Sequence, residues 1–180
     1  MKSRLKATLL SCLAMFVGAG LLCFATEHVA KAVFGVELPV QDQVEFVRRH
    51  MGWNATFAIL LLQIVAIMPA LEEILFRGLL WKLPLSLARR WSGPRGAGAR
   101  VVSACLVSAA FAFVHYIDYS RLIGGRGFSL VGWNSAFLAL FFVGMAQCWL
   151  YRKTDALWCP VANHALFNVL NTAMILLVSP

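Results

Sequence analysis

Two glutamates and an arginine, Glu72, Glu73 and Arg77, lie inside a stretch of sequence that is otherwise apolar enough to cross a membrane. Ionisable side chains at membrane depth are costly unless they are paired or hydrated, so they mark a functional site by default. Glu73 and Arg77 are four residues apart and share a helical face, in the acid-first order that favours an ion pair. Glu72 projects about 100° away around the helix. The spacing therefore predicts that Arg77 neutralises Glu73 and leaves Glu72 for chemistry.

Two histidines and an asparagine lie in other apolar segments. His115 ends the run Phe111-Ala-Phe-Val-His115, and His164 precedes Asn168 by four residues, so His164 and Asn168 share one helical face. Counted from the cytoplasmic ends of their segments at about 1.5 Å per residue, Glu72, His115 and His164 lie at compatible depths. We therefore expect these groups to meet in one cavity within the bilayer.

A carboxylate, two imidazoles and an amide in a partly dry cavity suit the hydrolysis of an acyl bond. We expect Glu72 to take a proton from water as general base, and His115 to hold that water or pass its proton to the leaving amine. His164 and Asn168 could donate hydrogen bonds to the developing oxyanion, a contribution of about 3–4 kcal/mol per donor in measured cases. Phe111 is interpreted as a packing aromatic that shapes the cavity.

The composition predicts a membrane protein. Of the 180 residues, 61% are hydrophobic and 13% are charged, whereas a soluble domain has about 25% charged residues. The predicted fold class is therefore an all-α, polytopic membrane bundle with about five transmembrane helices. The candidate spans are Ala7–Thr26, Ala55–Leu83, Val101–Ile117, Phe128–Leu150 and Ala156–Val178. Pro69, three residues before Glu72, is expected to kink the second span and free a carbonyl near the site.

The chain is expected to have two parts. Residues 1–54 would form an N-terminal transmembrane helix and an interfacial connection, in which Glu27–Asn54 forms a short amphipathic helix. Residues 55–180 would form the core that holds the site. The five cysteines are scattered and form no Cys-x-x-Cys pair, so they indicate neither a zinc ribbon nor a redox motif.

The net charge of +8 is interpreted as topology rather than as a nucleic-acid site, because the basic residues gather in short segments between apolar spans. The connection 84–100 holds four arginines and no acidic residue. The distribution predicts a cytoplasmic N-terminus in an integral, multi-pass protein, with a bacterial cytoplasmic (inner) membrane as the expected location. The expected partners are the lipid bilayer and a membrane-associated protein or peptide substrate, with no nucleic acid.

Three short motifs occur in a fixed order in separate apolar segments. They are Glu72-Glu73-x-x-x-Arg77, Phe111-x-x-x-His115 and His164-x-x-x-Asn168. Together they resemble the three motifs of the CPBP intramembrane proteases, also called the Abi or CAAX-protease family. The resemblance covers about Ala55 to Leu177. It implies a membrane-embedded endopeptidase that cuts a membrane-anchored substrate, removing a C-terminal sorting or CAAX-like tail or processing a bacteriocin.

The resemblance also implies a role for each matched residue. Glu72 matches the glutamate that activates water, and His115 matches the histidine paired with that water. His164 and Asn168 match the residues thought to stabilise the oxyanion. Glu73 and Arg77 match the supporting members of the first motif.

Several alternatives stay open at this stage. Relatives have been described as metalloproteases, and Glu72, His115 and His164 could bind zinc. We expect no cofactor, because the sequence lacks a His-Glu-x-x-His helix. A non-catalytic immunity or scaffold protein of the same fold is a second interpretation. A small transporter or proton relay is a third, since intramembrane Glu and His also mark proton paths.

Overall fold

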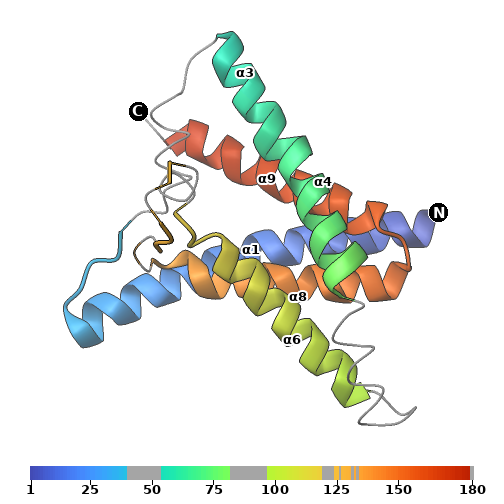
Figure 1. Ribbon diagram of the computed structural model, residues 1–180, viewed down its shortest axis with the longest axis horizontal. Coiled ribbons are helices and arrows are strands. Elements are labelled where there is room, and N and C mark those ends of the chain that lie inside the picture. Colours follow the sequence, from blue (N-terminus) through green and yellow to red (C-terminus); the bar gives the residue numbers. More distant parts are fainter. Residues whose placement is uncertain are drawn as a thin grey trace.

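A computed structural model describes residues 1–39, 54–81, 97–118, 124–125, 127–130, 132 and 134–178. Within these residues the fold is a bundle of helices, which confirms the predicted all-α class (Figure 1). The elements are α1 (Lys2–Phe34), α3 (Ala55–Leu62), η1 (Gln63–Ile67), α4 (Met68–Glu73), η2 (Ile74–Leu80), α6 (Ala97–Val114), α8 (Ala136–Thr154) and α9 (Trp158–Val178). The segments α3, η1, α4 and η2 follow one another without a break and form a single rod, Ala55–Leu80.

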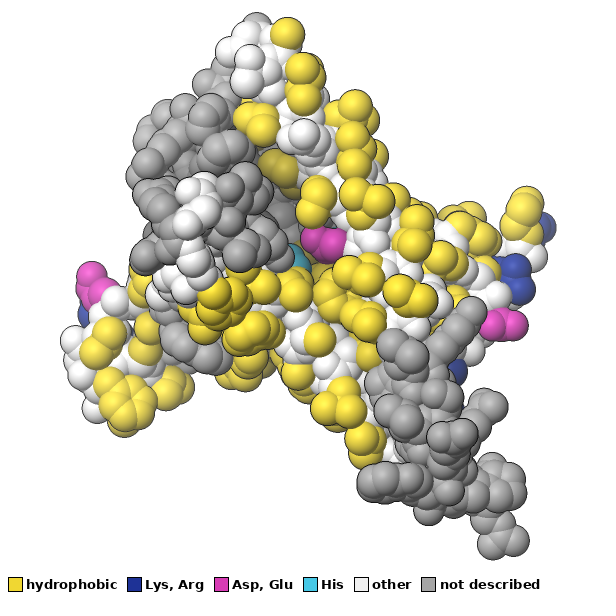
Figure 2. Space-filling model, viewed as in Figure 1, with side chains coloured by type: hydrophobic (Ala, Val, Ile, Leu, Met, Phe, Trp, Pro, Cys, Tyr) yellow, Lys and Arg dark blue, Asp and Glu magenta, His cyan; other side chains and the backbone are white. Residues whose placement is uncertain are grey.

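Three of the described helices are long and apolar enough to cross a membrane: α1, the Ala55–Leu80 rod and α9. A shorter apolar helix, Gly98–Val114, lies within α6. Hydrophobic side chains cover much of the visible surface, and most charged side chains gather near its extremities (Figure 2). One acidic side chain and one histidine reach the middle of this apolar face. The protein is an integral membrane protein, as the composition predicts.

The first helix is longer than the sequence indicates. It begins at Lys2 and continues to Phe34, so the segment 27–34, assigned above to an interfacial connection, belongs to α1. The helix ends where Gly35 adopts a left-handed conformation (φ 66°) and donates its N–H to the carbonyls of Ala30 and Lys31. Residues 35–39 of the predicted amphipathic helix are not helical. Residues 40–53 lie outside the described residues, as does most of the arginine-rich connection 84–100.

The fourth helix begins later than predicted, at Ala136 instead of Phe128. The Asn134 side chain sets this start, because its Oδ1 accepts the Ala136 N–H at 3.0 Å and the Tyr116 hydroxyl at 2.8 Å. The Asn134 side-chain oxygen therefore links Tyr116, just beyond the end of α6, to the first turn of α8.

α8 lies at the centre of the bundle and packs against α1, α6 and α9. The core between these helices and the rod contains Met15, Phe76, Phe111 and Val143. α6 and α8 approach closely at Gly144, where an added Cβ would lie 2.8 Å from the Ser108 Cβ and 2.9 Å from its Cα. A glycine is therefore required there, and the close crossing brings the α8 backbone toward the rod.

Candidate active site

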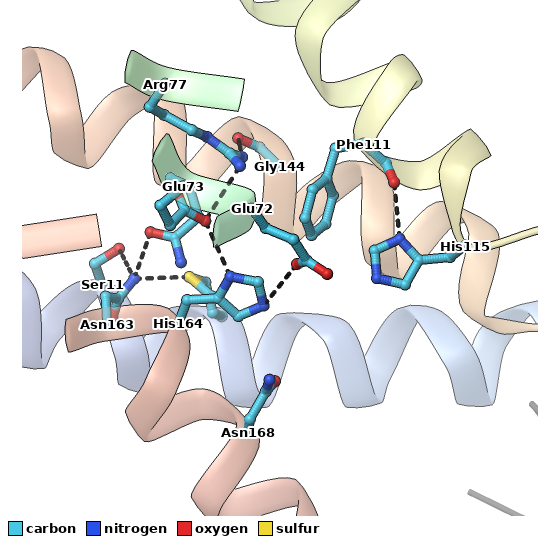
Figure 3. Close-up of polar contacts among 12 residues, drawn as sticks. Ser11, Glu72, Glu73, Arg77, Phe111, His115, Gly144, Asn163, His164 and Asn168 are labelled. Carbon is cyan, nitrogen blue, oxygen red and sulfur yellow. Dashed lines mark hydrogen bonds and ion pairs between the residues drawn. The ribbon is translucent and has the colours of Figure 1, made fainter. Parts of the chain in front are cut away.

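The most deeply buried part of the site joins Glu73, Arg77 and His164 (Figure 3). The Glu73 and Arg77 side chains are 0% exposed, and Arg77 Nη1 donates to Glu73 Oε1 at 3.1 Å, as their spacing predicts. The second arginine nitrogen, Nη2, donates to the Gly144 carbonyl at 2.8 Å. His164 Nδ1 lies 3.0 Å from the same Glu73 oxygen. A carboxylate beside a guanidinium accepts hydrogen bonds, so His164 carries a proton on Nδ1.

Glu72, the next residue along the rod, is held far less tightly. Its Oε2 lies 3.7 Å from His164 Nε2, which is beyond hydrogen-bond length, and its side chain is 19% exposed. Its carboxylate points away from Arg77, toward the side of the site where Phe111 and His115 lie (Figure 3). His164 is therefore placed between two carboxylates, with one ring nitrogen bonded to Glu73 and the other facing Glu72.

The Phe111 ring packs against the rings of both His115 and His164. Its buried ring lies 4.8 Å from the His115 ring and 5.7 Å from the His164 ring, measured between centroids. The Arg77 guanidinium carbon lies 5.0 Å from the same ring, and Phe76 meets it edge-on at 5.3 Å. Phe111 thus fixes the spacing of the imidazoles and contacts the buried cation.

His115 lies in the turn that closes α6, one residue beyond its last helical residue, Val114. The main-chain N–H groups of His115 and Tyr116 donate to the carbonyls three residues earlier, which tightens this turn. The imidazole Nδ1 lies 2.8 Å from the Phe111 carbonyl. A carbonyl only accepts, so Nδ1 is the donor and Nε2 of the neutral ring keeps a lone pair for another partner.

Asn168 lies one helical turn after His164, but the contact it makes is with the rod. Its Nδ2 donates to the main-chain carbonyl of Ile64, in η1, at 2.8 Å. An amide nitrogen has two N–H bonds, so one remains for a substrate group. The structure thus brings Glu72, Glu73, Arg77, Phe111, His115 and His164 into one connected cluster and places Asn168 at its border.

Behind the site lies a buried polar contact centred on Asn163, a residue that the sequence analysis did not single out. Asn163 Nδ2 lies within bonding distance of Gln147 Oε1 (3.1 Å), Ser11 Oγ (3.3 Å) and Met15 Sδ (2.9 Å). These residues join α9 to α8 and α1 immediately beside His164. Asn163 precedes His164 in the sequence, and this adjacency was the one available signal. Gly144 gave no signal, because its role depends on the carbonyl it exposes to Arg77.

Within the described residues, no three His, Cys, Asp or Glu side chains are grouped so that they could hold a metal ion. The zinc alternative, with Glu72, His115 and His164 as ligands, stays a prediction.

An apolar cavity of about 470 Å³ lies between the rod and α9. Its lining includes Leu61 and Val65 on the rod and Val169 and Leu176 on α9. Val65 and Val169 directly follow Ile64 and Asn168, so the cavity adjoins the hydrogen bond between these two residues.

These observations define a class: a helical membrane protein with a buried carboxylate–imidazole site suited to general acid–base chemistry. The family described as "Type II CAAX prenyl endopeptidase Rce1-like" has a sequence model that matches residues 52–170. The chain belongs to this family, which is a family of proteases. The match agrees with the CPBP, or CAAX-protease, family that the three motifs resemble. Comparisons with curated proteins and with solved structures gave no match.

Proposed function

We propose that the chain is an intramembrane endopeptidase in which Glu72 activates water for attack on a peptide bond. The observation that carries this proposal is the contrast between adjacent glutamates. Glu73 is bonded to Arg77 and His164, whereas Glu72 meets His164 only at 3.7 Å and is partly exposed. A general base needs room for the water it deprotonates, and only Glu72 has it.

The reaction begins when the Glu72 carboxylate takes a proton from water. The water oxygen forms a bond to the substrate carbonyl carbon, and the carbonyl electron pair moves onto oxygen. The second N–H of Asn168 stabilises this oxyanion by hydrogen bonding, and His164 does so in the form that carries a proton on Nε2 as well as on Nδ1. When the C–N bond breaks, the leaving nitrogen takes the proton from Glu72, directly or through His115. The products are a carboxyl group and an amine.

The position of His115 supports its part in this scheme. Its Nδ1 is held by the Phe111 carbonyl at 2.8 Å, so the ring has a defined orientation. The lone pair on Nε2 can accept a hydrogen bond from the attacking water and hold it in place, or carry the proton from Glu72 to the leaving nitrogen. Phe111 keeps this imidazole separate from His164, so one histidine serves the water and the other serves the oxyanion.

The substrate we propose is a membrane-associated or membrane-anchored protein with a C-terminal sorting or CAAX-like tail, or a bacteriocin precursor. The family match supports a substrate of this class, and the apolar cavity beside Asn168 could accept a hydrocarbon portion of it. We further propose a bacterial cytoplasmic (inner) membrane with the N-terminus in the cytoplasm, on the basis of the charge distribution.

The deciding experiment compares the termini of membrane proteins by mass spectrometry in native-host cells that make wild type or Glu72→Gln. Glu37→Gln is the matched control, because Glu37 is an exposed acid whose partner within the described residues is Lys31. We expect a new terminus with wild type and Glu37→Gln that Glu72→Gln does not produce. Equal profiles for wild type and Glu72→Gln, at matched expression, would contradict proteolysis by this site.

A further inference from the structure

Within the described residues, the carbonyl of Ile64 lacks both its α-helical and its π-helical main-chain donor. In an α-helix it would accept the N–H of Met68, four residues on. Here the Met68 N–H donates to Gln63 instead, five residues back, because the segment Gln63–Ile67 is π-helical. The π-helical donor for Ile64 would be residue 69, which is a proline and has no N–H. The π turn and Pro69 together leave this carbonyl without either of these two donors.

Asn168 supplies the missing donor from another helix. Its Nδ2 lies 2.8 Å from the Ile64 oxygen, in a part of the molecule that faces an apolar cavity. A carbonyl in hydrocarbon has no water to bond, so the side-chain donor removes a large penalty. Neighbouring Asn171 offers a contrast, because its Nδ2 bonds to the Phe167 carbonyl of its own helix at 3.0 Å.

The hydrogen bond between Asn168 and Ile64 also joins the rod to α9, the two elements that carry the glutamates and His164. The rod holds Glu72 and Glu73, and α9 holds His164 one turn before Asn168. A π turn inserts one residue into the helical repeat, so it rotates all later side chains by about 100° relative to an unbroken α-helix. The π turn before Pro69 therefore helps to decide which of the two glutamates faces His164 on α9.

We propose that Asn168 is a positioning residue that replaces the main-chain donor missing at Pro69, and so locks the π-helical register of the rod against α9. This inference does not depend on the proposed proteolysis. It predicts that the need for Asn168 is conditional on Pro69, since an N–H at position 69 would give the rod a main-chain route to satisfy Ile64.

The test is a double-mutant cycle on the full chain in detergent, with Asn168→Leu and Pro69→Ala. Leucine has nearly the shape of asparagine and no donor, so the change removes the bond without a large cavity. We expect Asn168→Leu to lower the unfolding midpoint by roughly 3–8 °C and to lose most of this effect in the Pro69→Ala background. Asn171→Leu should show no such dependence on Pro69.

Two local readouts accompany the midpoint. Hydrogen exchange in peptides covering residues 60–69 should quicken severalfold in Asn168→Leu and not in Asn171→Leu. In protein with ¹⁵N-labelled histidine, the His164 Nδ1 signal should shift in Asn168→Leu and return in the double variant, while exposed His28 does not change. An equal loss of stability in both backgrounds, or unchanged exchange over 60–69, would overturn the proposal. If Pro69→Ala does not fold, the exchange comparison between the two leucine variants decides alone.

Discussion

The two halves of the site, one around Glu73 and one around Glu72, differ in what holds them. Glu73 is fully buried, and its partners come from η2 and α9, while Arg77 also reaches α8. Glu72 is partly exposed and has only the longer approach to His164. A helix turns by about 100° per residue, so two adjacent, chemically identical residues face opposite environments. The buried half therefore holds His164 in place, whereas the open half leaves the Glu72 carboxylate partly exposed.

The largest expected effect comes from removing the buried cation. Arg77→Met leaves Glu73 charged and uncompensated in an apolar core, which costs about 3–5 kcal/mol. We expect little folded protein, measured as the monodisperse fraction in detergent and as the unfolding midpoint. Arg152→Met, at an exposed position in the last turn of α8, is the control. Wild-type stability in Arg77→Met would show that buried Glu73 does not need the Arg77 charge, and would contradict the difference drawn between the two halves.

In the open half the expected loss is of activity rather than of fold. His115→Gln removes the proposed partner of the water and should lower the cleavage rate by about 10²–10⁴-fold. The unfolding midpoint should fall only slightly, because the side chain makes one hydrogen bond, to Phe111. His28→Gln, which changes an exposed histidine stacked on Phe24, should leave cleavage unchanged. Unfolding of His115→Gln would place this residue with the buried half.

A smaller effect tests the support of the buried half. Gly144→Ala pushes a methyl group to within 2.8 Å of Ser108 and should cost about 1–3 kcal/mol of stability. Because the Gly144 carbonyl accepts from Arg77, cleavage should also fall. Gly20→Ala lies in α1 where nothing would contact the new methyl group, so it should raise stability by up to about 1 kcal/mol. The new methyl group would also lie 2.9 Å from the Ser108 Cα, so adding Ser108→Gly should recover only part of the loss. Wild-type stability in Gly144→Ala would contradict the clash.

The smallest expected effect is that of chelators. If Glu72 acts as base without a metal, treatment with a zinc chelator followed by its removal leaves the cleavage rate unchanged. The measurement is single-substrate cleavage before chelation, after it and after zinc is restored. A rate lost with chelation and regained with zinc would assign the open half to metal chemistry.

Local spacing predicted the parts of the site that lie within one helix. The four-residue interval placed Glu73 against Arg77 and turned Glu72 away. Partners from other helices could not be predicted in this way. The Arg77–Gly144 bond spans 67 residues, and nothing about a glycine indicates that its carbonyl will be used.

The helix boundaries show a second limit. The sequence analysis ended the first helix where the apolar run meets Glu27, yet α1 continues to Phe34. Loss of hydrophobicity marks where a helix leaves the bilayer, whereas the helix itself ends only where Gly35 reverses the backbone. The π turns gave no signal either, because inserting one residue in a uniformly apolar stretch changes no visible periodicity.

The contact between Ser11 and Asn163, 152 residues apart, has a consequence for biosynthesis. α1 enters the membrane first, with its α9 partner not yet made. Glu73 likewise lacks its bond to His164 until α9 is inserted. The nascent chain must therefore pass through the translocon with these polar groups unmatched, and the site can assemble only after α9 has been inserted into the bilayer.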